Sequence, residues 1–164
     1  MMPAAGQIHI REFRPGDERL FRELNEEWIT RYFEMEQADK EKLGDPRGRI
    51  LDHGGRILLA FDGDRGVGCC ALIPMASAEF EVAKMAVTET HRGKGIGHQL
   101  MTATIAKARE IGARRLYIET NHTLAPAIRL YRAHGFRDLP PERAVRSPYA
   151  RADVFMELVL ASAS

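Results

Sequence analysis

The sequence lacks several features that mark large classes of proteins, beginning with cysteine. Only 2 of its 164 residues are cysteines, and these two, Cys69 and Cys70, are adjacent in the chain. Neighbouring residues of a strand point to opposite faces, so we expect no disulfide between them and expect both to be packing residues. This cysteine usage fits a reducing compartment and predicts a cytoplasmic protein.

Long apolar runs, an excess of one charge and metal-ligand motifs are also missing. No apolar segment approaches the roughly 20 residues that cross a bilayer, and residues 1–14 lack the apolar run of a signal peptide. The 24 lysines and arginines against 23 acidic residues leave a net charge of +1, which favours neither nucleic acid nor a membrane as a partner. The six histidines form no close ligand spacing such as HExxH, so we expect no metal.

What is present predicts one α/β domain over residues 1–164, with an ordered core over about 8–160. Alternating apolar residues predict strands at 7–14, 56–62, 67–74, 79–87 and 115–120, a short strand from 136, and a last strand at 153–160. Helical spacing predicts helices near 17–33, 36–43, 96–111 and 126–134. The order β-α-α-β-β-β-α-β-α-β-β indicates a mixed (α+β) sheet, antiparallel in its first half, then a parallel strand–helix–strand crossover, with helices on both faces.

Three glycines at alternate positions, Gly93, Gly95 and Gly97, join the predicted strand at 79–87 to the long helix after it. Amide groups without side chains in front of them can converge on one point, and the helix dipole adds partial positive charge there. The loop therefore predicts an anion site suited to phosphate. Three neighbouring side chains add charge or hydrogen-bond donors: Arg92, Lys94 and His98.

These residues resemble the GNAT superfamily of N-acetyltransferases. The family signature for acyl-CoA is Arg or Gln, two residues, Gly, one residue, then Gly or Ala, which RGKGIG at 92–97 matches. EVAKMAV at 81–87 is similar to the family's fourth strand, APAIRLYRAHGF at 125–136 to its fourth helix and next strand, and SPYARADVFMEL at 147–158 to the last strand of a bacterial subgroup. The likeness covers about residues 8–160, and the three blocks in this order make it specific.

The resemblance implies acetyl-CoA as co-substrate, with its diphosphate held by the loop amides of Arg92, Gly93, Lys94, Gly95, Ile96, Gly97 and His98. It implies a bulge in the fourth strand, where the backbone of Met85, Ala86 and Val87 would pair with the pantetheine arm. Tyr131 would protonate the leaving thiolate, although it could instead be a core tyrosine. Glu81 would be the general base, although it could instead be a solvated carboxylate.

One position departs from the family pattern. Many relatives carry an asparagine seven residues before the tyrosine, where this chain has Leu124. Two interpretations of Asn121 stay open: it takes that place by binding pantetheine or the acceptor, or it is a turn residue. We expect three aromatic residues of the first helix, which flanks the acceptor cleft in relatives, to form a core stripe: Trp28, Tyr32 and Phe33. Lys84, His91 and His98 are expected to be surface charges or loop donors.

The sequence thus predicts an N-acetyltransferase that moves acetyl from acetyl-CoA to a primary amine by direct attack. The acceptor, a small molecule or a peptide, stays open, as does the oligomeric state, for which a homodimer is one option. A non-catalytic acyl-CoA sensor of the same fold is the alternative. A dinucleotide-binding fold is disfavoured because the glycines run GxGxG rather than GxGxxG, and a P-loop because no GKS or GKT follows.

Overall fold

The structure is a computed structural model that describes residues 7–143 and 147–160. Within these residues, seven strands form one sheet in the order β1-β2-β3-β4-β5-β7-β6. The strands are β1 (Ile8–Glu12), β2 (Arg56–Asp62), β3 (Arg65–Pro74), β4 (Glu79–Val87), β5 (Arg115–Thr120), β6 (Arg137–Asp138) and β7 (Val154–Val159). The α-helices are α1 (Glu18–Tyr32), α2 (Gln37–Gly44), α3 (Pro46–Arg49), α4 (Ile96–Glu110) and α5 (Ala125–Ala133), with short 3₁₀ turns η1 (Leu51–His53), η2 (Glu89–His91) and η3 (Pro141–Arg143).

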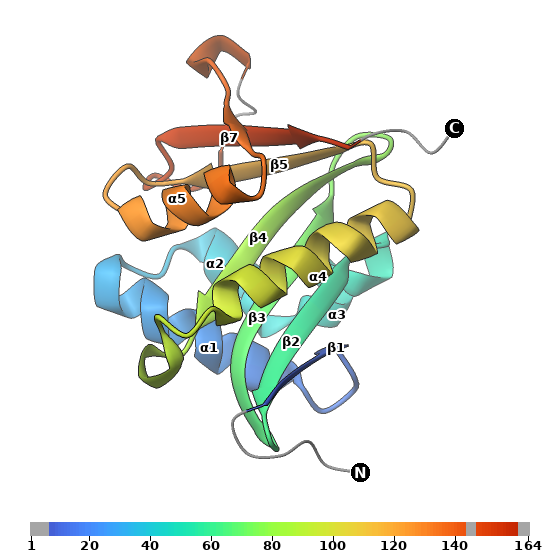
Figure 1. The fold of residues 1–164 in the computed structure, drawn as a ribbon, viewed down its shortest axis with the longest axis vertical. Helices are drawn as coiled ribbons and strands as arrows, with labels where there is room; N and C mark the ends of the chain where they lie inside the picture. Colours follow the sequence, from blue (N-terminus) through green and yellow to red (C-terminus); the bar gives the residue numbers. More distant parts are fainter. Residues whose placement is uncertain (1–6, 144–146, 161–164) are drawn as a thin grey trace.

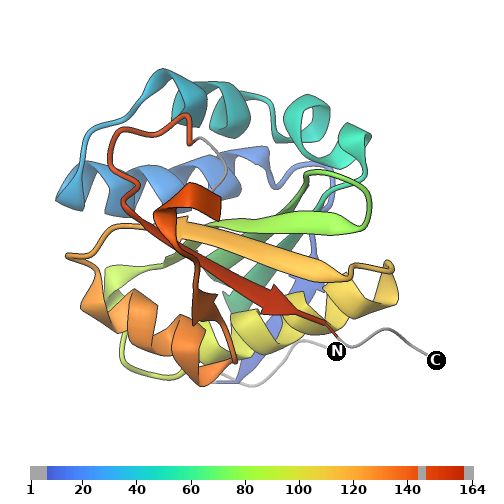
Figure 2. The ribbon, with the colours of Figure 1, turned by 90° about the horizontal axis from the view of Figure 1, so that it is seen from above.

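Helices cover both faces of the sheet, as predicted. Helices α1, α2 and α3 lie on one face and α4 and α5 on the other (Figures 1 and 2). Each face has its own buried core. Cys69 belongs to the core beneath α1 and Cys70 to the core beneath α4, and both are free thiols. The expectation that the two cysteines face opposite ways and serve packing is therefore confirmed.

Strands β1 to β4 form the antiparallel half of the sheet. β2 and β3 are joined by a two-residue turn at Gly63 and Asp64, where Gly63 has a φ of +63° that favours glycine. The sequence predicted the two strands, at 56–62 and 67–74, within the antiparallel half of the sheet. It predicted only a helix end at Gly44 to Pro46, whereas Pro46 also begins α3, with the Asp45 side chain accepting a hydrogen bond from Gly48 N at 3.0 Å.

The crossover from β4 through α4 to β5 makes the one parallel pair among the described strands. α4 buries the apolar stripe that the sequence predicted, formed by Ile96, Leu100, Met101, Thr104 and Ala108. This packing fixes the start of α4, and hence the glycine loop, over the end of β4. The fold class predicted from the sequence is confirmed.

A bilayer sets a minimum length and a minimum apolarity for any of the helices in the described ranges that could cross it. None of them reaches both.

Candidate active site

Strands β4 and β5 pair over only a short stretch and then diverge. Their parallel pairing holds for three residue pairs and ends at Glu81 opposite Tyr117. Beyond that pair the strands diverge, as Figure 1 shows. A cleft of about 760 Å³ lies along the exposed side of β4, between α1 and α5, and it is lined by every residue from Glu81 to Val87.

A bulge in β4 follows shortly after the last pair with β5. Cys69 of β3 faces Ala86 and Ala71 faces Ala83, so two residues of β4, Lys84 and Met85, stand opposite one residue of β3. Lys84 has a φ of +54°, a conformation that costs a residue with a side chain about 1–3 kcal/mol. The bulge that the family resemblance implied is therefore present.

The glycine loop closes one end of the cleft. Gly93 and Gly95 have φ values of +75° and +80°, and Gly95 is the residue on which α4 begins. A Cβ at either position would meet nothing within 4 Å, so the space in front of both is open. Gly97 has a different role, because a Cβ there would meet Leu130 of α5 at 3.1 Å. The loop thus combines open space beside two glycines with the N-terminus of a helix, an arrangement that suits an anion.

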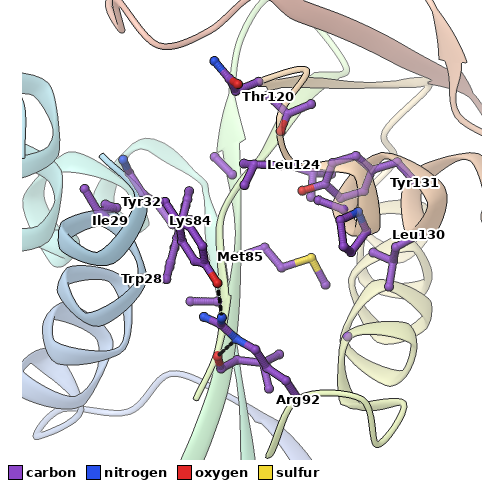
Figure 3. Close-up of a pocket in the computed structure, with 18 of the residues that line it drawn as sticks. Trp28, Ile29, Tyr32, Lys84, Met85, Arg92, Thr120, Leu124, Leu130 and Tyr131 are labelled. Atoms are coloured by element: carbon purple, nitrogen blue, oxygen red, sulfur yellow. Dashed lines mark hydrogen bonds between the residues drawn. The ribbon is translucent and has the colours of Figure 1, made fainter. Parts of the chain in front are cut away.

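Most of the predicted loop residues line the cleft, but not all of them do. Arg92 donates from Nε to the carbonyl of Val87 at 3.2 Å and from Nη1 to the Tyr32 hydroxyl at 2.8 Å (Figure 3). His98 is exposed, and its Nδ1 lies 3.0 Å from Nε2 of His134. Lys94 is exposed and lies outside the lining. The cofactor roles of all these residues remain predictions.

Tyr131 reaches the cleft from α5. Its side chain and that of Met85 project into the cleft from opposite sides (Figure 3). Burial, and after it the nearby Cys70 thiol, raises the pKa of Tyr131, so the hydroxyl keeps its proton. Within the described residues this hydroxyl has no hydrogen-bond partner, which leaves it available to a ligand. The geometry suits a proton donor.

Two carboxylates, those of Glu81 and Glu119, line the cleft where β4 leaves β5. Burial, and then the charge of Glu119, raises the pKa of Glu81 to about 7. Glu119 accepts hydrogen bonds from Ser147 Oγ at 2.6 Å and from the Tyr117 hydroxyl at 3.3 Å. Neither carboxylate forms an ion pair with a lysine or arginine of the described residues. Glu81 is therefore poised to exchange a proton near neutral pH, and its partly buried position differs from a fully solvated strand-face carboxylate.

Asn121 has its side chain already engaged. Its Nδ2 donates to the Arg151 carbonyl at 2.7 Å, and its Oδ1 accepts from Thr123 N at 2.9 Å and from Thr123 Oγ1 at 2.6 Å. These bonds shape the turn after β5, although Asn121 also lines the cleft. A contact from Asn121 to pantetheine stays a prediction, and the second hydrogen of Nδ2 is the group left to make it, since Oδ1 already accepts two bonds.

Three expectations about individual side chains were wrong. Tyr32 is 48% exposed rather than part of a core stripe, because it turns toward Arg92. His91 is buried, and its Nε2 lies 3.0 Å from Asp62 Oδ2. Lys84 is buried and reaches Asp39 at 2.8 Å, so the side chain at the bulge is not a surface charge.

The model of the acetyltransferase (GNAT) family matches residues 17–136 of the chain. The chain belongs to this family. An uncharacterised N-acetyltransferase of Bacillus subtilis, YvbK, is 33% identical over 98 residues, which cover 58% of this chain and 63% of that protein. Streptothricin acetyltransferase of Streptomyces lavendulae is 35% identical over 89 residues, covering 54% of this chain and 47% of that protein. The chain thus spans less than two thirds of the length of these relatives.

Solved GNAT structures share the fold over nearly the whole chain. A GNAT acetyltransferase from Staphylococcus aureus superimposes with a TM-score of 0.86 at 21% identity. The match covers 94% of this chain and 100% of that protein. An acetyltransferase from Salmonella typhimurium, solved with acetyl-CoA, gives a TM-score of 0.76 at 21% identity and covers 97% of each chain. At this identity the likeness establishes the fold of this GNAT chain.

In residues 7–143 and 147–160, no three histidine, cysteine, aspartate or glutamate side chains are grouped so that they could hold a metal ion.

Proposed function

We propose that this GNAT protein is an acetyl-CoA-dependent N-acetyltransferase that acetylates a primary amine by direct attack. One observation carries the proposal: a glycine loop at a helix N-terminus, a protonated tyrosine hydroxyl and a carboxylate with a raised pKa all line the same cleft. The loop of residues 92–97 stands at one end, Tyr131 on one side, and Glu81 on the floor where β4 leaves β5. The family membership and the relatives named as N-acetyltransferases support it.

The loop would hold the diphosphate of acetyl-CoA. Open space lies beside the α-carbons of Gly93 and Gly95, where an added Cβ would meet nothing within 4 Å, and the N-terminus of α4 adds partial positive charge. The backbone at the bulge would hold the pantetheine arm. Because the Val87 carbonyl already accepts from Arg92, Met85 and Ala86 are the better candidates for that pairing.

Acetyl-CoA, when bound, supplies a thioester carbonyl that a neutral amine can attack. Glu81 would accept a proton from the acceptor ammonium, directly or through a water, and so release the lone pair of the amine. Tyr131 would donate its proton to the sulfur as the C–S bond breaks. The raised pKa of Tyr131, which follows from burial, keeps it protonated until negative charge develops on the sulfur.

The acceptor would enter beside α1. Trp28, Tyr32 and Phe33 line that side of the cleft, and Tyr149 and Arg151 line the wall formed by the segment before β7. An amine on a small molecule or at the end of a peptide fits this description.

The proposal is tested by incubating the protein with acetyl-CoA and a panel of amines, and by measuring the release of free CoA thiol. Cys69 and Cys70 are buried, so they do not compete for a thiol reagent under native conditions. We expect acetyl-CoA to raise the melting temperature, since a ligand at 100 times its dissociation constant adds about 2.7 kcal/mol. We also expect amine-dependent thiol release. Stabilisation without release for any amine would favour the acyl-CoA sensor, and neither effect would overturn the proposal.

A further inference from the structure

Lys84 places a buried ammonium group beside the cleft. Its side chain is 5% exposed, and its Nζ donates to Asp39 Oδ1 at 2.8 Å and to the Tyr149 hydroxyl at 2.7 Å. Asp39 lies on α2 and is fully buried, with a side-chain exposure of 0%. One side chain of the catalytic strand therefore holds both α2 and the segment that precedes β7.

The partner of Lys84 is itself fixed by a second cation. Arg151 donates to both carboxylate oxygens of Asp39, at 2.8 and 2.7 Å, and also pairs with Glu36 at 3.2 Å. Arg151 and Lys84 each lie 4.5 Å from the centre of the Tyr149 ring. Although burial opposes it, hydrogen bonds from Arg151 and Lys84 hold the pKa of Asp39 below its usual range. The ammonium of Lys84 is therefore paired with an ionised Asp39 carboxylate that Arg151 holds in place.

From this arrangement we infer that Lys84 is a positioning residue for the proposed acetyl transfer. Its ion pair with Asp39 holds the β4 bulge in place, and the bulge sets which side chains and which backbone of β4 face the cleft. The expected effect of Lys84 on acetyl transfer rests on the proposed function. The expected effect on CoA affinity does not require that any amine is acetylated.

The backbone at Lys84 gives the first argument. A φ of +54° suits glycine and, less well, asparagine, whereas lysine adopts it at a cost. A strained residue persists only where its surroundings outweigh the strain. Here the compensation comes from the far end of the side chain, because only a long cationic side chain spans the distance from β4 to the carboxylate on α2.

The register of β4 gives the second argument. Val82, Met85 and Val87 all contact the core beneath α4, and the step of three residues between the first two is possible only with the bulge. If β4 became regular, a shift by one residue would exchange the faces of Met85 and Ala86. Met85 would then leave the cleft, and the strand could continue its pairing with β5 where the pantetheine arm is expected to lie.

The charge of Lys84 has a further effect on Glu81. The charged groups that act on Glu81 are Glu119 on β5, Lys42 on α2 and Lys84 on β4 itself, and the neutral hydroxyl of Tyr149, before β7, also interacts with Glu81. Burial and Glu119 raise the pKa of Glu81, and Lys42 and Lys84 lower it. Removing the ammonium of Lys84 would therefore raise that pKa further.

Two substitutions separate the backbone from the side chain. Lys84→Met removes the ion pair and leaves the backbone strain, so β4 should relax and the dissociation constant of CoA should rise about tenfold. Lys84→Gly also removes the ion pair but adopts the positive φ freely, so it should keep most of the CoA affinity. In both variants the acidic limb of kcat/KM, measured with the fastest amine of the panel, should move to higher pH.

Ala78→Gly is the matched control, since Ala78 has a φ of +59° in the turn before β4 and lies outside the cleft lining. It should change neither the CoA affinity nor the pH profile. If Lys84→Met does not fold, Asp39→Asn tests the same pair and should weaken CoA binding in the same direction. CoA binding needs no acceptor, so it decides the inference even if no amine is acetylated. Equal CoA affinity in the wild type and the Lys84→Met or Asp39→Asn variant would overturn it.

Discussion

Glu81 and Glu119 stand on the two strands that diverge to open the cleft, and each lacks a lysine or arginine ion-pair partner among the described residues. Glu81 faces Tyr117 in the last pair of the β4–β5 ladder, and Glu119 lies two residues further along β5. Burial comes first among the causes that bring the pKa of Glu81 to about 7, and the negative charge of Glu119 follows. The position of the strands thus sets the proton affinity of the proposed base.

This relationship predicts the pH dependence of the reaction. Glu81 must be deprotonated to accept a proton, so kcat/KM should fall as the pH drops below about 7. In Glu119→Gln the repulsion is lost, the pKa of Glu81 falls, and the acidic limb should move to lower pH. A pH profile of thiol release measures both. An acidic limb that stays in place in Glu119→Gln would contradict the coupling of the two carboxylates.

The raised pKa of Glu81 also means that its ionised form destabilises the folded protein. Between its ordinary pKa of 4.5 and about 7, the folded protein holds more protons at this site than the unfolded chain. The free energy of unfolding therefore falls as the pH rises through this window, and the loss is complete above pH 7.

We expect Glu81→Gln to abolish most of the activity and to raise the stability at pH 8 by about 1–3 kcal/mol, with little change at pH 4. Chemical denaturation at the two pH values measures the effect. Glu142→Gln, at an exposed position on η3, is the control and should change neither quantity. If the gain in the free energy of unfolding of Glu81→Gln over the wild type is no larger at pH 8 than at pH 4, then ionised Glu81 does not destabilise the fold.

Tyr131→Phe tests the proton donor without changing the shape of the cleft. We expect kcat to fall by about 10²- to 10⁴-fold, the range that a general acid contributes, while the dissociation constant of CoA stays close to that of the wild type. Calorimetry with CoA and thiol-release kinetics give the two numbers. A phenylalanine variant with normal turnover would assign Tyr131 to packing against Phe136, whose ring centre lies 6.2 Å away.

The sequence predicted the parts of the site that follow from local chemistry. The alternate glycines require a strand-to-helix turn, and the structure places Gly95 at the start of α4. The apolar stripe of α4 and the alternation of the strands fixed the order of elements and the layers. Glu81, Met85 and Tyr131 were predicted from the resemblance to the family, and the structure brings all three to the cleft.

The rest depended on contacts between distant segments. No local signal in the sequence pointed to Glu119, because its place beside Glu81 arises from the pairing of β5 with β4. The pair of Lys84 with Asp39 joins residues that are 45 positions apart. One signal was present in the sequence: in a regular strand Lys84 would share a face with Val82 and Ala86, both of which are buried. A lysine at such a position indicates either a bulge or a buried partner, and the structure contains both.

The central claim is that the amides around Gly95 hold the diphosphate of CoA, and the binding of CoA to a Gly95→Asp variant tests it most directly. Gly112→Asp is a matched control, because Gly112 lies just beyond the other end of α4, has a φ of +87°, and has nothing within 4 Å of a Cβ. Both variants carry the same backbone strain and the same added charge. Gly95→Asp should raise the CoA dissociation constant by about 100-fold or more, since a carboxylate would repel the diphosphate, whereas Gly112→Asp should leave it unchanged. Wild-type CoA affinity in a folded Gly95→Asp protein would contradict the account.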